Sequence, residues 1–206
     1  MKKWLLRGWI AFIVISLLSM SSCGMFTSDK NKESGALGNS VSQQKNTKHT
    51  PPTMDEMIEA YRDAAKAYEY IEVSPLPLHS KPVTVDGFRY YQVSVDGMET
   101  LADLTEYLKC YFSDGIVTGL LNQDTAPYRD IDGKLYGLNG GRGKNIALGK
   151  EQYSYSERSG TEVVLEVTVE NLDEEDLETV TGHTTHNFVY EKTDDQWVFT
   201  EFPYFR

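Results

Sequence analysis

A run of glycines beside two basic residues is the stretch of this sequence best suited by composition to close contact with a ligand. Residues 132–145 read DGKLYGLNGGRGKN, and the candidate binding residues within them are Gly140, Gly141, Arg142, Gly143 and Lys144. A phosphate loop would need a glycine five positions before its Gly-Lys pair and a hydroxyl residue after it. Leu138 and Asn145 occupy those positions, so nucleotide binding is excluded. A loop that contacts a partner and a flexible connection between two strands both remain open.

Other catalytic arrangements find little support in the sequence. His183 and His186 are three residues apart in an expected strand, so they project to opposite faces and cannot hold one metal ion. The chain has no G-x-S-x-G nucleophile motif. We expect no metal and no cofactor. One catalytic alternative stays open, which is an acidic residue with a raised pKa in the mouth of a cone-shaped cavity.

Acidic residues dominate the segment from Glu162 to Glu178, which holds eight carboxylates and no lysine or arginine. Its first part alternates, with valines and a leucine on one expected face and the candidate partner-binding residues on the other, namely Glu162, Glu166 and Glu170. Three interpretations are open for this face: a solvated surface, an electrostatic guide for a basic protein, or weak cation binding. The DEED sequence lacks the ligand spacing of a tight calcium loop.

The first 22 residues are typical of a bacterial lipoprotein signal peptide. Three basic residues precede an apolar run that is too short to span a bilayer, and two serines then precede Cys23. We expect Cys23 to be acylated after cleavage, which predicts a cell-membrane lipoprotein on the extracytoplasmic side. The alternative is an uncleaved signal anchor with the same topology. Residues 23–52 are polar and predict a disordered tether, and residues 53–206 predict a single domain.

The charge of the chain limits its partners. The formal net charge is −11, and loss of the three basic residues of the signal peptide would make it −14. Such a charge disfavours nucleic acid and anionic lipid as partners and favours cationic surfaces.

The order of the expected elements predicts an α+β fold. Thr53 and Thr100 begin capping-box patterns ahead of two amphipathic helices, and Ser113 is expected to cap a third helix. Asp86-Gly87 and Asp132-Gly133 are typical of hairpin turns. Alternating runs then extend over residues 128–138, 151–158, 162–171, 179–192 and 196–202. We therefore expect helices packed on one face of a curved antiparallel sheet.

The stretches FRYYQV, DGMETLADLTEYLKCYF and YRDIDGKLYGLNGGRG resemble the IseA-type family of Gram-positive cell-envelope proteins, which includes an inhibitor of cell-wall DL-endopeptidases. The resemblance implies a cystatin-like or nuclear-transport-factor-like fold. It also implies a non-catalytic inhibitor of a peptidoglycan hydrolase of the NlpC/P60 cysteine-peptidase type. The long acidic second half departs from the family pattern.

We therefore predict a lipid-anchored, extracytoplasmic binding or regulatory domain without catalytic activity. One alternative is a cone-shaped small-ligand-binding or enzymatic domain, with a cavity lined by Tyr61, Tyr68 or Tyr91. The other is an interaction module of a membrane-associated assembly.

Overall fold

The computed structural model describes residues 50–206, and their fold is α+β as the sequence predicts. Helix α1 (Met54–Glu72) begins at the predicted capping box, where Thr53 Oγ1 accepts a hydrogen bond from Glu56 N at 3.4 Å. The Glu56 carboxylate in turn accepts one from Thr53 N at 2.8 Å. The first four backbone N–H groups of a helix have no acceptor within the helix. This reciprocal pair of hydrogen bonds supplies acceptors at that end, and it therefore fixes the residue at which α1 begins.

Two shorter helices follow the first hairpin. Helix α2 (Leu101–Lys109) has the predicted capping box at Thr100, which Asp103 completes. Helix α3 (Asp114–Leu121) has Ser113 at its N-cap as predicted, although that side chain makes no capping hydrogen bond. The backbone N–H of Ser113 instead donates to Phe199 O at 2.9 Å, which ties the α2–α3 junction to the last strand.

The first sheet has the strand order β1-β2-β4-β3 and is antiparallel throughout. Its strands are β1 (Leu78–Val85), β2 (Phe88–Val93), β3 (Tyr128–Ile131) and β4 (Lys134–Leu138). Both predicted Asp-Gly turns close hairpins here, with positive φ at the aspartate and at the glycine of each. Positive φ at both central residues is typical of a two-residue hairpin turn whose twist matches the right-handed twist of the flanking strands.

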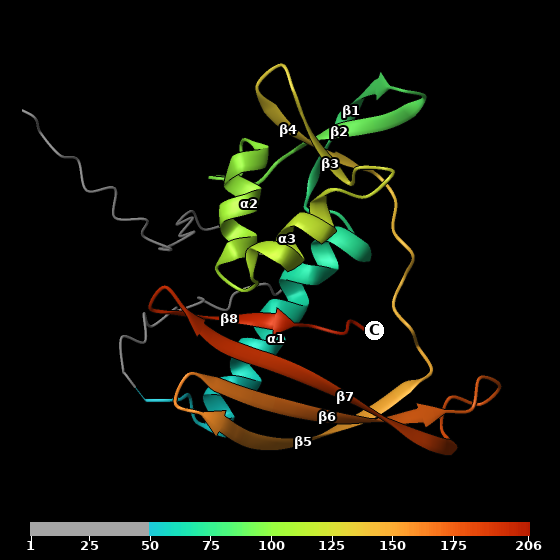
Figure 1. The fold of residues 1–206 in the computed structure, drawn as a ribbon. Helices are drawn as coiled ribbons and strands as arrows, with labels where there is room; N and C mark the ends of the chain where they lie inside the picture. The colour runs from blue at the N-terminus through green and yellow to red at the C-terminus, as the bar shows by residue number, and fades with distance from the viewer. Residues whose placement is uncertain (1–49) are drawn as a thin grey trace, which may run out of the picture.

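The second sheet is an antiparallel meander with longer strands in sequence order. Its strands are β5 (Leu148–Ser159), β6 (Glu162–Leu172), β7 (Val180–Thr193) and β8 (Gln196–Glu201). Figure 1 shows this twisted sheet around one end of α1, with the first sheet at the other end and α2 and α3 alongside. The strands thus form two sheets, whereas the sequence predicts one. The two sheets are separate because a long connection lies between β4 and β5.

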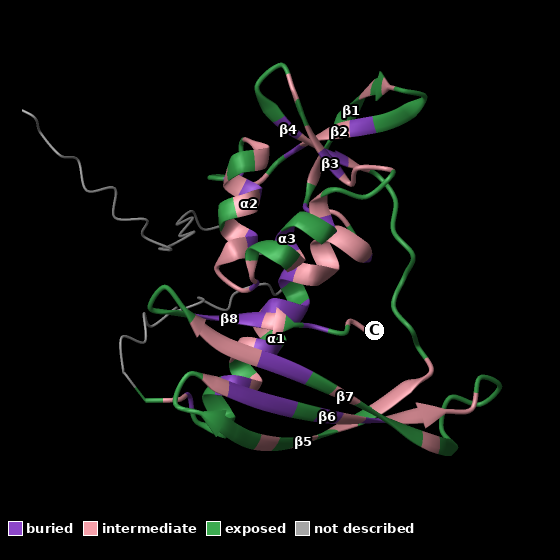
Figure 2. Cartoon of the chain, in the orientation of Figure 1, coloured by how far each residue is buried: buried purple, intermediate pink, exposed green. Residues whose placement is uncertain are grey.

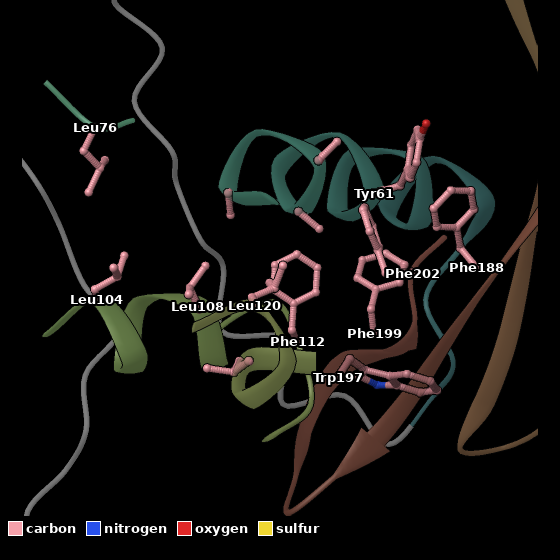
Figure 3. Packing of buried hydrophobic residues seen from close by; sticks show 14 of the residues in the cluster. Tyr61, Leu76, Leu104, Leu108, Phe112, Leu120, Phe188, Trp197, Phe199 and Phe202 are labelled. Atoms are coloured by element: carbon pink, nitrogen blue, oxygen red, sulfur yellow. The ribbon is translucent and has the colours of Figure 1, made fainter. Parts of the chain in front are cut away.

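The hydrophobic core lies between α1, the inner face of the second sheet, and the two short helices. Along β6 the predicted core residues Val163, Leu165, Val167 and Val169 are all at most 1% exposed. Figure 2 shows the buried positions of β6, β7 and β8 together with those of α1. In Figure 3 the rings of Tyr61, Phe112, Phe188, Phe199 and Phe202 form the aromatic part of this core.

Candidate functional site

The glycine-rich stretch belongs to the connection between the two sheets, residues 139–147, which we call the connector. It packs against its own domain, because a Cβ atom at Gly141 would lie only 1.6 Å from the backbone oxygen of Val73, just past α1. A Cβ atom at Gly140 would meet nothing within 4 Å. Gly141 therefore allows a close backbone approach, and the approached group is the end of α1.

The two cations of the connector are also engaged within the domain. Lys144 Nζ lies 2.7 Å from the Glu69 carboxylate on α1. The Arg142 guanidinium lies over the Tyr204 ring, 5.4 Å from its centroid. These contacts leave both side chains exposed but direct them toward α1 and the C-terminal segment, so the connector does not protrude as a free loop.

The three glutamates of the acidic run lie on the outer face of β6, as their alternation predicts. Glu162 pairs with Arg158 at 2.9 Å, and Glu166 accepts a hydrogen bond from Ser154 Oγ at 3.3 Å. Glu170 accepts one from the backbone N–H of Lys150 at 3.0 Å. The structure thus separates these residues from the connector cations, which lie on the inner side of the sheet near α1.

An open cavity of about 500 Å³ lies on that inner side, between α1, the connector, β5 and the last two residues. Four cationic residues and one acidic residue contribute to its lining, namely Arg62, Lys144, Lys150, Arg206 and Glu151. Tyr153, Phe205, Val169 and Leu148 supply ring and aliphatic surface. Of the predicted binding residues, only Lys144 lies at this cavity.

Glu151 accepts three interactions, although its side chain is only 11% exposed. Tyr61 OH donates to Glu151 Oε1 at 3.2 Å, and Tyr153 OH donates to Oε2 at 2.5 Å. The Arg206 guanidinium forms an ion pair with Oε1. Burial raises the pKa of the Tyr61 hydroxyl, which therefore stays protonated as a donor. These three donors hold the Glu151 carboxylate in place.

The C-terminal segment that supplies Arg206 is held mainly by its side chains. The Tyr204 ring stacks on Tyr68 with centroids 4.6 Å apart, and the Phe205 ring stacks on His186 at 4.2 Å. Residues 203–206 make no backbone hydrogen bond to other residues of the described range. Arg206 Nε is buried and has no hydrogen-bond partner among residues 50–206. An unpaired buried donor costs about 1–3 kcal/mol, so this seating is incomplete.

Two of the three tyrosines proposed for a cone-shaped cavity lie near this site. Tyr61 donates to Glu151, and Tyr68 supports the C-terminal segment through Tyr204. Tyr91 lies in the first sheet, opposite Pro82 and Gly137, and belongs to neither group. His183 and His186 take opposite faces of β7 as predicted, since they pair with Glu170 and Val167 respectively.

Sequence reasoning missed the residues at the centre of this cavity: Glu151, Arg206, Arg62 and Lys150. One indication was available for Glu151, which shares the inward register of β5 with Tyr153 and Tyr155. An acidic residue in the core-facing register of a strand needs a buried partner. No pattern in the sequence identifies Arg206 as that partner, because the two residues are 55 positions apart.

Cys23, the expected lipidation site, lies outside the described residues. Within residues 50–206 we find no helix long and apolar enough to cross a membrane. The same range holds no group of three or more side chains placed to bind a metal ion. No family model and no curated protein matches the chain.

Proposed function

We propose that this protein is a lipid-anchored, extracytoplasmic binding domain whose cavity between α1 and β5 takes an anionic ligand. The observation that carries the proposal is the charge of the lining: four cationic residues and one acidic residue line the cavity in a chain whose formal net charge is −11. Cations gathered at a concave site raise the local concentration of anions. The anchor and the location rest on the N-terminal sequence that ends at Cys23.

Binding, as opposed to catalysis, fits the state of Glu151. A general base must be free to take a proton from a substrate. Glu151 already accepts two tyrosine hydroxyls and the Arg206 ion pair, so both of its oxygens are engaged. The ring and aliphatic surface beside the cations would contact the apolar part of an organic anion.

The test is calorimetric titration of the full-length chain in nonionic detergent with acetate, citrate and inorganic phosphate, and with methylguanidinium as the cationic probe. We expect at least one anion to bind and methylguanidinium not to bind. Lys150→Glu and Arg62→Glu should each weaken anion binding by about tenfold, since each places a like charge at the site. The matched control is Lys81→Glu, an exposed position in β1 of the first sheet. Anion binding that is equal in all four proteins would refute the proposal.

A second candidate is binding to a basic envelope protein, such as the hydrolase that the IseA resemblance implies. It is favoured by the acidity of the second sheet, in which residues 148–201 hold fourteen carboxylates and three basic residues. We expect the association rate with such a hydrolase to fall between about 0.05 and 0.5 M salt, because salt screens exposed charges beyond roughly 8 Å. An unchanged rate, or full hydrolase activity at saturating protein, would exclude this candidate.

A further inference from the structure

The donors around Glu151 form a complete receptor for a carboxylate group. Three donors converge on its two oxygens. They are the Tyr61 hydroxyl from α1, the Tyr153 hydroxyl from β5 and the Arg206 guanidinium from the C-terminal segment. Arginine and hydroxyl donors suit the oxygens of a carboxylate, as their contacts with Glu151 show. In this structure the carboxylate that the receptor holds comes from the protein's own chain.

The receptor also faces the proposed ligand site. Glu151, Tyr153 and Arg206 all line the cavity, together with the cationic residues Arg62 and Lys150. The Arg206 side chain remains 35% exposed, so a ligand in the cavity can reach the guanidinium.

The segment that holds Arg206 is able to shift without breaking secondary structure. β8 ends at Glu201, and residues 203–206 rely on ring stacking and on the Arg206 ion pair. Moving the guanidinium from one carboxylate to another therefore costs no backbone hydrogen bonds among residues 50–206.

We infer that the ligand of the cavity carries a carboxylate, and that it competes with Glu151 for the Arg206 guanidinium. Glu151 is thus an internal competitor that weakens binding, while Arg206 is the anchor of the ligand. This inference rests on the proposed anion-binding function. It predicts opposite effects from the two partners of one ion pair, since loss of Glu151 frees the anchor and loss of Arg206 removes it.

The experiment compares the full-length wild-type chain with Glu151→Gln, Arg206→Ala and Glu201→Gln, titrated with acetate, succinate and inorganic phosphate. Glu151→Gln keeps an acceptor for the tyrosine hydroxyls, and we expect it to bind the carboxylates about fivefold more tightly, because the competing charge is gone. Arg206→Ala should weaken binding by about tenfold, a loss typical of a desolvated charged contact. Glu201→Gln removes one exposed carboxylate from the same sheet and should bind as wild type does.

A second measurement needs no variant. In wild-type protein labelled with ¹⁵N-arginine, binding of acetate to the Arg206 guanidinium should shift its side-chain resonances, and this shift should follow the same saturation curve as the calorimetry. Equal or weaker carboxylate binding by Glu151→Gln, or an Arg206 resonance that stays fixed at saturation, would overturn the inference. Tighter binding of phosphate than of either carboxylate would overturn the assignment of the ligand class.

The two levels of proposal fail in different ways. If wild type binds no anion and Lys150→Glu changes nothing, the proposed function itself fails. If wild type binds anions and Lys150→Glu weakens that binding, but Glu151→Gln does not strengthen it, only the competition inference fails.

Discussion

The two faces of the second sheet use the same residue type in opposite ways. On the inner face, Glu151 is 11% exposed and holds two hydroxyls and a guanidinium. On the outer face, Glu162, Glu166 and Glu170 make single contacts with neighbouring strands and remain partly or fully exposed. The difference shows that the side of the sheet, and not the density of acidic residues in the sequence, decides which carboxylate can organise a site.

Solvent gives the physical reason for this difference. Water screens an exposed ion pair, which typically contributes about 0–1 kcal/mol. A buried charge must be matched by partners, so its loss leaves those partners unsatisfied in a region of low dielectric. The inner carboxylate therefore links three elements, whereas each outer carboxylate can be replaced with little structural effect.

The largest expected effect comes from truncating one carboxylate on each face. Glu151→Ala should lower the free energy of unfolding by about 3 kcal/mol, since it leaves a partly buried guanidinium and two tyrosine hydroxyls without their acceptor. Glu166→Ala on the outer face should change it by less than about 0.5 kcal/mol. Urea unfolding followed by circular dichroism measures both values. Similar losses in the two variants would show that the faces do not differ.

A smaller effect is expected at the connector, which closes one side of the inner cavity. Gly141→Ala should cost about 2 kcal/mol, because the added methyl group would overlap the Val73 carbonyl oxygen and force the connector away from α1. Gly140→Ala is the matched control, since its methyl group enters open space and should cost nothing or stabilise by about 0.5 kcal/mol. Thermal unfolding of the two variants tests the packing, and equal melting temperatures would contradict it.

The smallest expected effect is a pH dependence of stability that comes from His186, on the inner face of the second sheet. Burial lowers the pKa of His186, whose ring stacks on Phe205. The unfolded chain therefore binds a proton at this histidine more readily than the folded chain does. The contribution of His186 to the free energy of unfolding is fully present above about pH 6.5, and it is lost as the pH falls through the pKa of the folded state. We expect His186→Gln to lose less stability than wild type between pH 7 and pH 5. His183→Gln, on the exposed face of β7, is the control.

Local chemistry made much of the fold predictable. The Thr53 and Thr100 capping boxes and the two Asp-Gly turns formed as predicted, because each depends on residues at most three positions apart. The alternation along β6 also identified its buried face, since the side-chain period of a strand is 2. Ser113 occupies the predicted N-cap position, but its side chain makes no capping hydrogen bond.

The candidate site was not predictable to the same degree. The sequence drew attention to the connector glycines, yet their close approach is to Val73 of the same domain. It also drew attention to the acidic run, whose Glu162, Glu166 and Glu170 lie on the face away from the cavity. Glu151 and Arg206 attracted no attention, because a single acid in a tyrosine-rich strand and one arginine near the end have no distinctive spacing.

Local sequence patterns and composition were enough to predict the helices, the hairpin turns, the inward face of β6 and the strongly acidic character of the chain. Each of these follows from neighbouring residues or from composition, which folding does not change. The division of the strands into two sheets, and the meeting of Glu151 with Tyr61, Tyr153 and Arg206, became visible only in the folded chain. Those contacts join positions far apart in the chain, and their geometry exists only once α1 and the C-terminal segment pack on the inner face.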